Sequence, residues 1–140
     1  MKARRYNAGK LKWSLVSWKA LAPLVKVLMY GAHKYSVWES TADGSKFTGV
    51  DITPEGAQTL INNKEIKLVS SGANNWKSGM PVTEVWESLQ RHLHAWIEGE
   101  DNDDESGLSH LGHAMCNLMF LSWIMIFKRE TFDDRGKEDE

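Results

Sequence analysis

The chain has 140 residues, of which 41% are hydrophobic and 26% charged, the composition expected of a soluble globular protein. Its formal net charge of −2 argues against a general nucleic-acid binder, because such a protein needs a basic face for phosphate contacts. The one cysteine, Cys116, excludes an intrachain disulfide. Together with the lack of an apolar N-terminal signal segment, it predicts a cytoplasmic protein.

The N-terminal third begins with a polar, basic segment, residues 1–12, which we expect to form an arm. From Trp18 to about Tyr35 the apolar residues recur at helical spacing, so this segment predicts a first helix. We place Pro23 in the first turn of that helix, where proline is tolerated.

Residues 36–74 predict an insertion with little regular structure. Two strand-like runs, 46–50 and 65–70, flank a short helical pattern that starts at Thr53-Pro54. Threonine before proline suits a helix N-cap followed by the first helical position. We therefore expect a small two-stranded ribbon with one short helix.

Two further helices are predicted in the C-terminal half. The first runs over 82–98, with Thr83 as a candidate cap and Gly99 just past its end. The second runs over 105–127, with Asp103 or Asp104 as its cap. The second is apolar nearly all round, and its most apolar part is short and interrupted for a membrane span, so we interpret it as buried.

These patterns together predict a mainly α protein, a compact bundle of about three main helices in a single domain over 1–140. The insertion of residues 36–74 and an acidic tail over 129–140 would be additions to the bundle.

The segment 91–117 carries most of the chemical information. It reads RHLHAWIEGEDNDDESGLSHLGHAMCN and contains four of the five histidines beside a run of carboxylates. Imidazoles and carboxylates this close together can bind a metal ion, and a metal ion can activate water.

A polar stripe marks the last of the predicted helices. His110, His113 and Asn117 fall within about 60° of a helical wheel, and His92 points toward the apolar side of the preceding helix. The stripe predicts a site, although three satisfied core residues would give the same pattern. Glu84 and Glu87 form an E-x-x-E pair that can clamp a divalent cation, but a solvated helix face explains them better.

Several segments resemble one family, the phage and prophage domain described as the N-terminal domain of dATP/dGTP diphosphohydrolases, which is similar in outline to the MazG-like all-α nucleotide pyrophosphohydrolases. The most specific part is the run E-S-G-x-x-H-x-x-H over 105–113. The other matching segments are Gly9-Lys10-x-x-Trp13-x-Leu15 with Trp18, Tyr30-Gly31-Ala32-x-Lys34-Tyr35, Asn75-Trp76-x-x-Gly79-Met80, Arg91-His92-Leu93 and Gly99-Glu100-Asp101-x-Asp103.

The resemblance implies a metal-dependent hydrolase that converts deoxynucleoside triphosphates to the monophosphate and pyrophosphate. The catalytic candidates are Glu105, His110 and His113. The metal-binding candidates are His92, Glu100, Asp101, His110, His113 and Asn117. The substrate-binding candidates, cations for phosphate and aromatic or amide groups for the base, are Lys10, Trp13, Lys34, Tyr35, Asn75, Trp76 and Arg91.

The chain departs from the MazG-like pattern in two respects. Its last helix offers His-x-x-His and Asn117 where those enzymes have acidic pairs, and histidine, a softer ligand, would favour Mn²⁺ or Zn²⁺ over Mg²⁺. The segment between Tyr35 and Asn75 is an addition to the family pattern.

Two other functions stay open on the sequence. The protein could bind or sequester a nucleotide without cleaving it, or its histidines could serve only packing and interaction. Because few helices must bury seven tryptophans, we expect a homo-oligomer, with no nucleic-acid polymer or membrane as partner.

Overall fold

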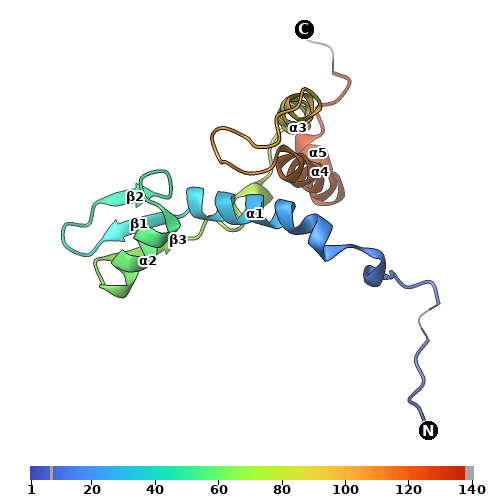
Figure 1. The fold of residues 1–140 in the computed structure, drawn as a ribbon, viewed down its shortest axis with the longest axis horizontal. Helices are drawn as coiled ribbons and strands as arrows, with labels where there is room; N and C mark the ends of the chain where they lie inside the picture. The colour runs from blue at the N-terminus through green and yellow to red at the C-terminus, as the bar shows by residue number, and fades with distance from the viewer. Residues whose placement is uncertain (7, 138–140) are drawn as a thin grey trace.

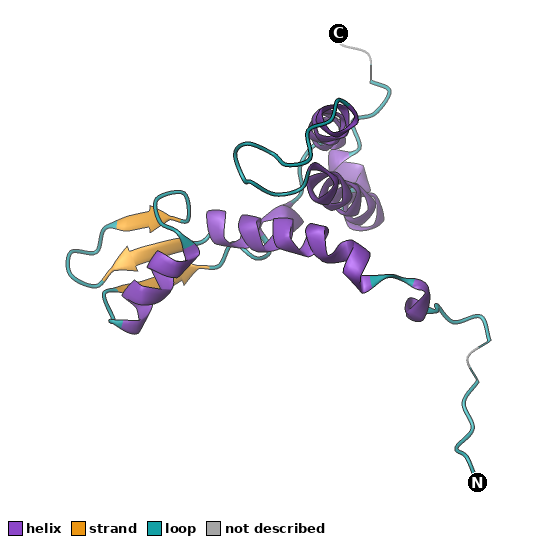
Figure 2. Ribbon diagram, viewed as in Figure 1, coloured by secondary structure: helices purple, strands orange, loops and turns teal. Residues whose placement is uncertain are grey.

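A computed structural model describes residues 1–6 and 8–137 (Figure 1). Three long helices dominate it: α1 (Trp18–Lys34), α3 (Val82–Ile97) and α4 (His110–Phe127). α4 packs against both α1 and α3, and a small sheet lies beyond the C-terminal end of α1 (Figure 2). The prediction of a mainly α protein with three main helices is confirmed. The shorter elements are η1 (Trp13–Leu15), β1 (Val37–Ser40), β2 (Lys46–Thr48), α2 (Pro54–Asn62), β3 (Ile66–Ser70), η2 (Asn75–Ser78) and α5 (Arg129–Phe132).

Helix α1 starts earlier than the position of its proline suggested. The Ser17 side chain accepts a hydrogen bond from the Ala20 N–H at 3.2 Å, so Ser17 is the N-cap and Pro23 lies inside the helix. Placing Pro23 in the first turn was therefore wrong. Proline has no N–H, so the Lys19 carbonyl loses its usual helical donor at this position.

Thr83 does not cap α3, as the sequence had suggested. The N-cap is Pro81, and both the N–H and the hydroxyl of Thr83 donate to the Asp134 carboxylate, at 3.0 and 2.6 Å. Asp134, near the C-terminus, thus accepts the hydrogen bond of a backbone N–H in the first turn of α3, which has no partner within the helix. The C-terminal end was predicted correctly, because Gly99 follows the C-cap Glu98 with a φ of 103° that favours glycine.

Helix α4 begins at His110, later than the predicted start near Glu105. Its cap is Ser109, which accepts from the Gly112 N–H at 3.2 Å. Asp103 was a wrong choice of cap because its carboxylate accepts from the Ser106 N–H at 2.9 Å and so closes a turn within the loop. This turn keeps the E-S-G segment out of the helix and beside its N-terminus.

The inserted segment contains a three-stranded antiparallel sheet in the order β2-β1-β3, so the prediction of two strands was wrong. The short central strand β1 was missed because its only buried residue is Trp38, which leaves almost no alternation to detect. Trp38 faces Phe47 and Leu68 across the sheet and packs with Ala57 and Ile66 in a small core. The Thr53 cap of α2 is confirmed, since its side chain accepts from the Gly56 N–H.

Both ends of the insertion meet at Ser36. Its hydroxyl donates to the Ala32 carbonyl at 2.7 Å and accepts from the Gly72 N–H at 2.9 Å. A Cβ on Gly72 would lie 2.4 Å from the Ala32 oxygen, so only glycine fits there. These buried contacts hold Tyr35 and the segment from Gly72 to Trp76 against the end of α1.

The C-terminal segment is part of the bundle rather than a tail over its whole predicted length of 129–140. Residues Arg129–Phe132 form α5, and Phe132 packs on a core of Val82, Val85 and Ile124. The last three residues, 138–140, lie outside the described part of the chain.

Helix α4 is less covered than its apolar composition had suggested. Only 28% of its residues are buried, and Ile126 is 70% exposed. By length and composition, with a mean hydropathy of 1.3, this helix could also cross a membrane. Its packing between α1 and α3, with a polar stripe facing them, is that of a bundle helix.

Candidate metal and nucleotide site

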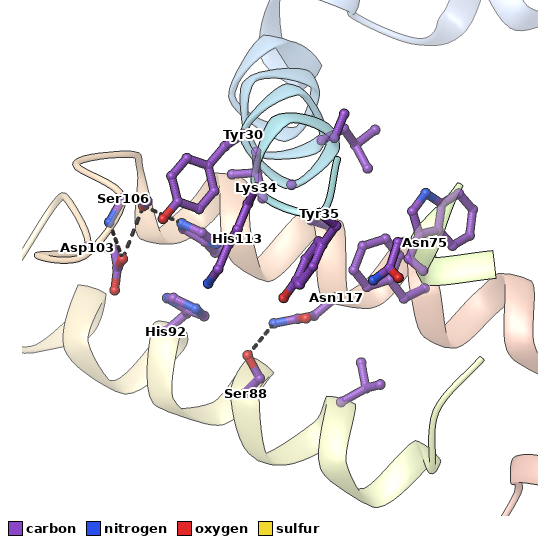
Figure 3. Close-up of a pocket in the computed structure, with 18 of the residues that line it drawn as sticks. Tyr30, Lys34, Tyr35, Asn75, Ser88, His92, Asp103, Ser106, His113 and Asn117 are labelled. Carbon is purple, nitrogen blue, oxygen red and sulfur yellow. Dashed lines mark hydrogen bonds between the residues drawn. The ribbon is translucent and has the colours of Figure 1, made fainter. Parts of the chain in front are cut away.

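A cavity of about 710 Å³ lies between α1, α3, α4 and the loop that joins α3 to α4 (Figure 3). Each of these segments contributes polar side chains. The polar residues lining the cavity are Tyr30, Lys34, Tyr35, Asn75, Glu84, Ser88, Arg91, His92, Asp103, Glu105, Ser106, His110, His113 and Asn117. The cavity therefore collects most of the residues that the sequence had singled out.

Three imidazoles meet at one end of this cavity. The Nδ1 atoms of His92 and His110 are 2.9 Å apart, and the rings of His92 and His113 stack at 4.4 Å between centroids. His110 is buried, whereas His92 and His113 are partly buried. The grouping follows from helical spacing, because His110 and His113 share one face of α4 and that face meets α3.

Asp103 joins two of these histidines in a group that could hold a metal ion. One ligand atom from each of His92, Asp103 and His110 lies within 4.8 Å of the others. Two imidazole nitrogens bound to one ion at about 2.0–2.1 Å and at a right angle would be roughly 3 Å apart, close to the separation of the two Nδ1 atoms. Nitrogen and oxygen donors of this kind fit a divalent transition metal.

Ser106 connects Asp103 to His113. Its Oγ lies 3.1 Å from the Asp103 carboxylate and 2.7 Å from Nε2 of His113. A carboxylate only accepts, so the Ser106 hydroxyl donates to Asp103 and the His113 Nε2–H donates to Ser106. This arrangement leaves Nδ1 of His113 unprotonated and able to accept a proton.

The electrostatics of the site favour neutral imidazoles and an ionised carboxylate. Burial lowers the pKa of His113, and burial together with the neighbouring His113 and His110 lowers the pKa of His92. Burial by itself raises the pKa of Asp103, but hydrogen bonds from Ser106 and the nearby histidines lower it overall. Neutral imidazole and carboxylate are the forms that bind metals.

Glu100 and Asp101 lie beside the group rather than in the cavity lining. The Glu100 Oε1 atom is 3.2 Å from Nε2 of His110, the ring nitrogen opposite the one that faces His92. Asp101 contributes its backbone carbonyl, which accepts from the His110 N–H at 2.9 Å. Asp101 therefore positions the backbone of His110, and Glu100 lies within ion-pair distance of the His110 ring.

The cationic side of the cavity comes from Lys34 and Arg91. The Lys34 ammonium pairs with Glu105 at 3.0 Å, and this hydrogen bond raises the pKa of Lys34. Its Nζ also lies 5.9 Å from the Tyr30 ring centre and 5.7 Å from that of Tyr35. Glu105, predicted as catalytic, thus holds the lysine that would contact phosphate.

The opposite end of the cavity is amide-bearing and aromatic. The Asn117 Nδ2 donates to the Ser88 Oγ at 3.1 Å, and Asn75 and Tyr35 lie nearby (Figure 3). Trp76 also lines the cavity. Trp76 is stacked on Phe120 with ring centres 5.0 Å apart.

The structure does not bring Lys10 or Trp13 to the cavity. Both are exposed on the N-terminal segment, and Trp13 is 64% accessible. In Figure 1 this segment runs away from the bundle. A basic arm has no local signal that fixes where it packs, so its position could not be predicted from periodicity.

Sequence reasoning missed four cavity residues and undervalued a fifth. Asp103 was part of a family-matching segment, but its one assigned role was that of a helix cap, and no role was given to Tyr30, Ser88 or Ser106. Ser106 lies inside the E-S-G run, so the motif itself was a usable signal. Glu84, interpreted as part of a solvated face, is exposed but also lines the cavity.

The fold and site define a helical protein with a histidine–carboxylate group at one end of a nucleotide-sized cavity. Residues 1–135 match the family model described as dATP/dGTP diphosphohydrolase, N-terminal, and the chain belongs to this family. It is 38% identical over 64 residues to the dATP/dGTP diphosphohydrolase of Salmonella phage PMBT28. That match covers 46% of this chain and 21% of the relative, so the chain spans about a fifth of the relative's length. No solved structure matches.

Proposed function

We propose that this protein hydrolyses deoxynucleoside triphosphates, dATP and dGTP among them, to the monophosphate and pyrophosphate with the help of a divalent metal. One observation carries the proposal: His92, Asp103 and His110 converge in a cavity that also contains Lys34 and Arg91. A metal group beside cations is the arrangement that phosphoryl chemistry uses. The family description and the phage relative's name support the same substrates.

Each residue has a defined task in this proposal. His92, Asp103 and His110 would hold Mn²⁺ or Mg²⁺, with Zn²⁺ as a further candidate, and the bound metal would polarise phosphate oxygens and lower the pKa of a water. Lys34 and Arg91 bind the phosphate oxygens as charge-assisted donors. Nδ1 of His113 accepts a proton from the attacking water, and Ser106 holds that imidazole in place.

The experiment that tests this proposal compares His110→Ala with His94→Ala. Wild-type protein is incubated with each common dNTP and NTP in Mg²⁺ or Mn²⁺, and products are read by mass spectrometry. His94 is exposed on the same helix as His92 and is outside the cavity lining, so its variant should keep full activity. His110→Ala should lose turnover while the fold survives. Normal turnover in His110→Ala would reject the assignment.

A non-catalytic nucleotide-binding role is the second candidate. It is favoured by the composition of the metal group, in which Asp103 is the one carboxylate, whereas MazG-like enzymes use acidic pairs. The same screen decides between the two functions. Tight binding of an intact nucleotide with no product after long incubation would establish the binding role, and cleavage would exclude it.

We also propose that the chain forms a homo-oligomer. Its accessible surface is 10801 Å², whereas a folded monomer of this mass exposes about 7,300 Å². The extended N-terminal segment accounts for part of this excess, and apolar side chains of α3 and α4 add to it, with Ile97 70% and Leu118 54% exposed. A stable interface needs about 800 Å² per partner. A monomer by light scattering at micromolar concentration would contradict the proposal.

A further inference from the structure

The cavity has a different character at each end, and two of the three helices that line it, α3 and α4, show the change in the same order. On α3 the inward residues run from His92 to Ser88 and then to Val85. On α4 they run from His113 to Asn117 and then to Phe120. Each step is three or four residues, about one helical turn or roughly 4.5–6 Å along the axis. Along these two helices the metal group is therefore followed first by a pair of neutral polar side chains and then by the apolar side chains of Val85 and Phe120, with Glu84 exposed beside them.

Ser88 and Asn117, in the middle of this series, form a hydrogen-bonded pair that still has one free donor and one free acceptor. The Asn117 Nδ2 donates to the Ser88 Oγ at 3.1 Å. This bond leaves the Asn117 Oδ1 as an acceptor and the Ser88 hydroxyl proton as a donor, side by side on partly buried residues. Figure 3 shows both side chains on the far side of His92 from Asp103.

A donor beside an acceptor complements the edge of either purine base. Adenine presents an amino donor next to a ring nitrogen acceptor, and guanine presents O6 next to its N1–H donor. The two bases present the donor and the acceptor in opposite order along this edge, so each base would meet the Asn117–Ser88 pair in a different orientation. Tyr35 is 51% exposed at this end of the cavity, which leaves its ring available to stack on a base.

We propose that Ser88 and Asn117 bind the edge of the purine base of the substrate, with Tyr35 stacked on the base and the triphosphate directed to the histidine end. This inference rests on the proposed function, because it assumes a nucleotide in the cavity. It assigns Asn117 to specificity rather than to the metal.

Kinetics with a substrate analogue test the assignment. The full chain is assayed with dATP, dGTP and the triphosphate of purine deoxyriboside, which lacks the exocyclic groups. Wild-type kcat/KM should be at least about tenfold lower for the analogue, because the site's polar groups are left unpaired. In Asn117→Ala and in Ser88→Ala this preference should fall to within about twofold, mainly through KM.

Two controls separate specificity from folding and from metal binding. Ser122→Ala, at an exposed position on α4 outside the cavity, should keep the wild-type preference. Mn²⁺ affinity without nucleotide, measured from the free Mn²⁺ electron paramagnetic resonance signal, should stay within about twofold of wild type in Asn117→Ala. A loss of tenfold or more would make Asn117 a metal ligand and overturn the inference. A preference that survives in both Asn117→Ala and Ser88→Ala would overturn it as well.

Failure of the proposed function has a different signature. If wild-type protein hydrolyses none of the three triphosphates, hydrolysis is rejected, and equilibrium binding of the same compounds replaces the kinetics. Loss of the binding preference in both cavity variants would still support the base subsite, and its persistence would overturn the subsite too.

Discussion

Ser106 is the residue through which the loop and α4 act together. Its hydroxyl bridges the Asp103 carboxylate and the His113 ring, and its backbone N–H closes the turn at Asp103. The geometry depends on the single hydroxyl proton, which goes to the carboxylate and thereby fixes the protonation of His113. A small side chain in the E-S-G run thus orders two groups of the site.

In the proposed hydrolysis of dNTPs, Ser106→Ala should lower kcat by about 10- to 100-fold, because a hydrogen bond to a charged group contributes roughly 1.5–3 kcal/mol. The Ser106 N–H still closes the turn, so the melting temperature should change little. Steady-state kinetics and thermal unfolding measure the two effects. Unchanged kcat would show that the orientation of His113 has no part in turnover.

Cys116 shows how strongly the centre of α4 is shielded. The residue is 2% exposed, and burial raises the pKa of its thiol to about 12. The thiolate is the reactive form, so native protein should react with a thiol reagent such as DTNB far more slowly than protein in denaturant. Equal rates in the two conditions would contradict the packing of α4 against α1 and α3.

At the level of elements, the crossing of α1 and α4 determines where the histidines lie. Gly112 stands between His110 and His113 and lies against α1, where an added Cβ would be 2.6 Å from the Pro23 carbonyl oxygen. The glycine therefore lets α4 approach α1 closely enough to enclose one side of the cavity. The hydrogen bonds of Ser36 to Ala32 and Gly72 likewise hold the end of the inserted segment close to α1, at the rim of the cavity.

Gly112→Ala should destabilise the protein by about 1–3 kcal/mol, because the methyl group forces the two helices apart. Gly31→Ala is the matched control: Gly31 is also helical, and an added Cβ there meets nothing within 4 Å. That substitution should stabilise the protein by roughly 0.5–1 kcal/mol, since alanine restricts the unfolded chain. Urea denaturation measures both. Equal effects would contradict the close α1–α4 contact.

The whole molecule should lose stability in acid because the fold holds two imidazoles in their neutral form. The pKa values of His92 and His113 are lowered from the ordinary 6.5 in the folded state. Below pH 6.5 the unfolded chain binds more protons than the folded one, so the free energy of unfolding falls with the pH. Above that value these two groups contribute no pH dependence.

Urea midpoints of the metal-free protein, taken on both sides of pH 6.5, test this expectation. The His92→Gln/His113→Gln double variant should lose the pH dependence in this window. Asp103, Asp133 and Asp134 have lowered pKa values and add a separate loss of stability at lower pH. A wild-type midpoint that rises as the pH falls from 7 to 6 would contradict the argument.

Much of the fold was predictable because helices are local structures. The 3.6-residue repeat alone located α1, α3 and most of α4 and placed His110, His113 and Asn117 on one face. The missed strand β1 has no comparable repeat, since pairing on both of its edges defines it. The start of α4 was misplaced because the Asp103 carboxylate accepts from the Ser106 N–H in the loop, and helix propensity does not predict such a bond.

The sequence by itself determined the helical class, the polar stripe and the family, since these depend on periodicity and on a contiguous motif. Only the tertiary structure decided which carboxylate joins the histidines. Asp103 turns into the cavity, whereas Glu100 lies beside the His110 ring and Asp101 contributes its backbone carbonyl. Glu105, in the same loop, pairs with Lys34 of α1. Six carboxylates within eight residues look alike in sequence. Hydrogen bonds in the loop and the packing of the helices give these carboxylates different positions. The sequence does not predict those positions, because the interacting residues are not spaced at a regular repeat.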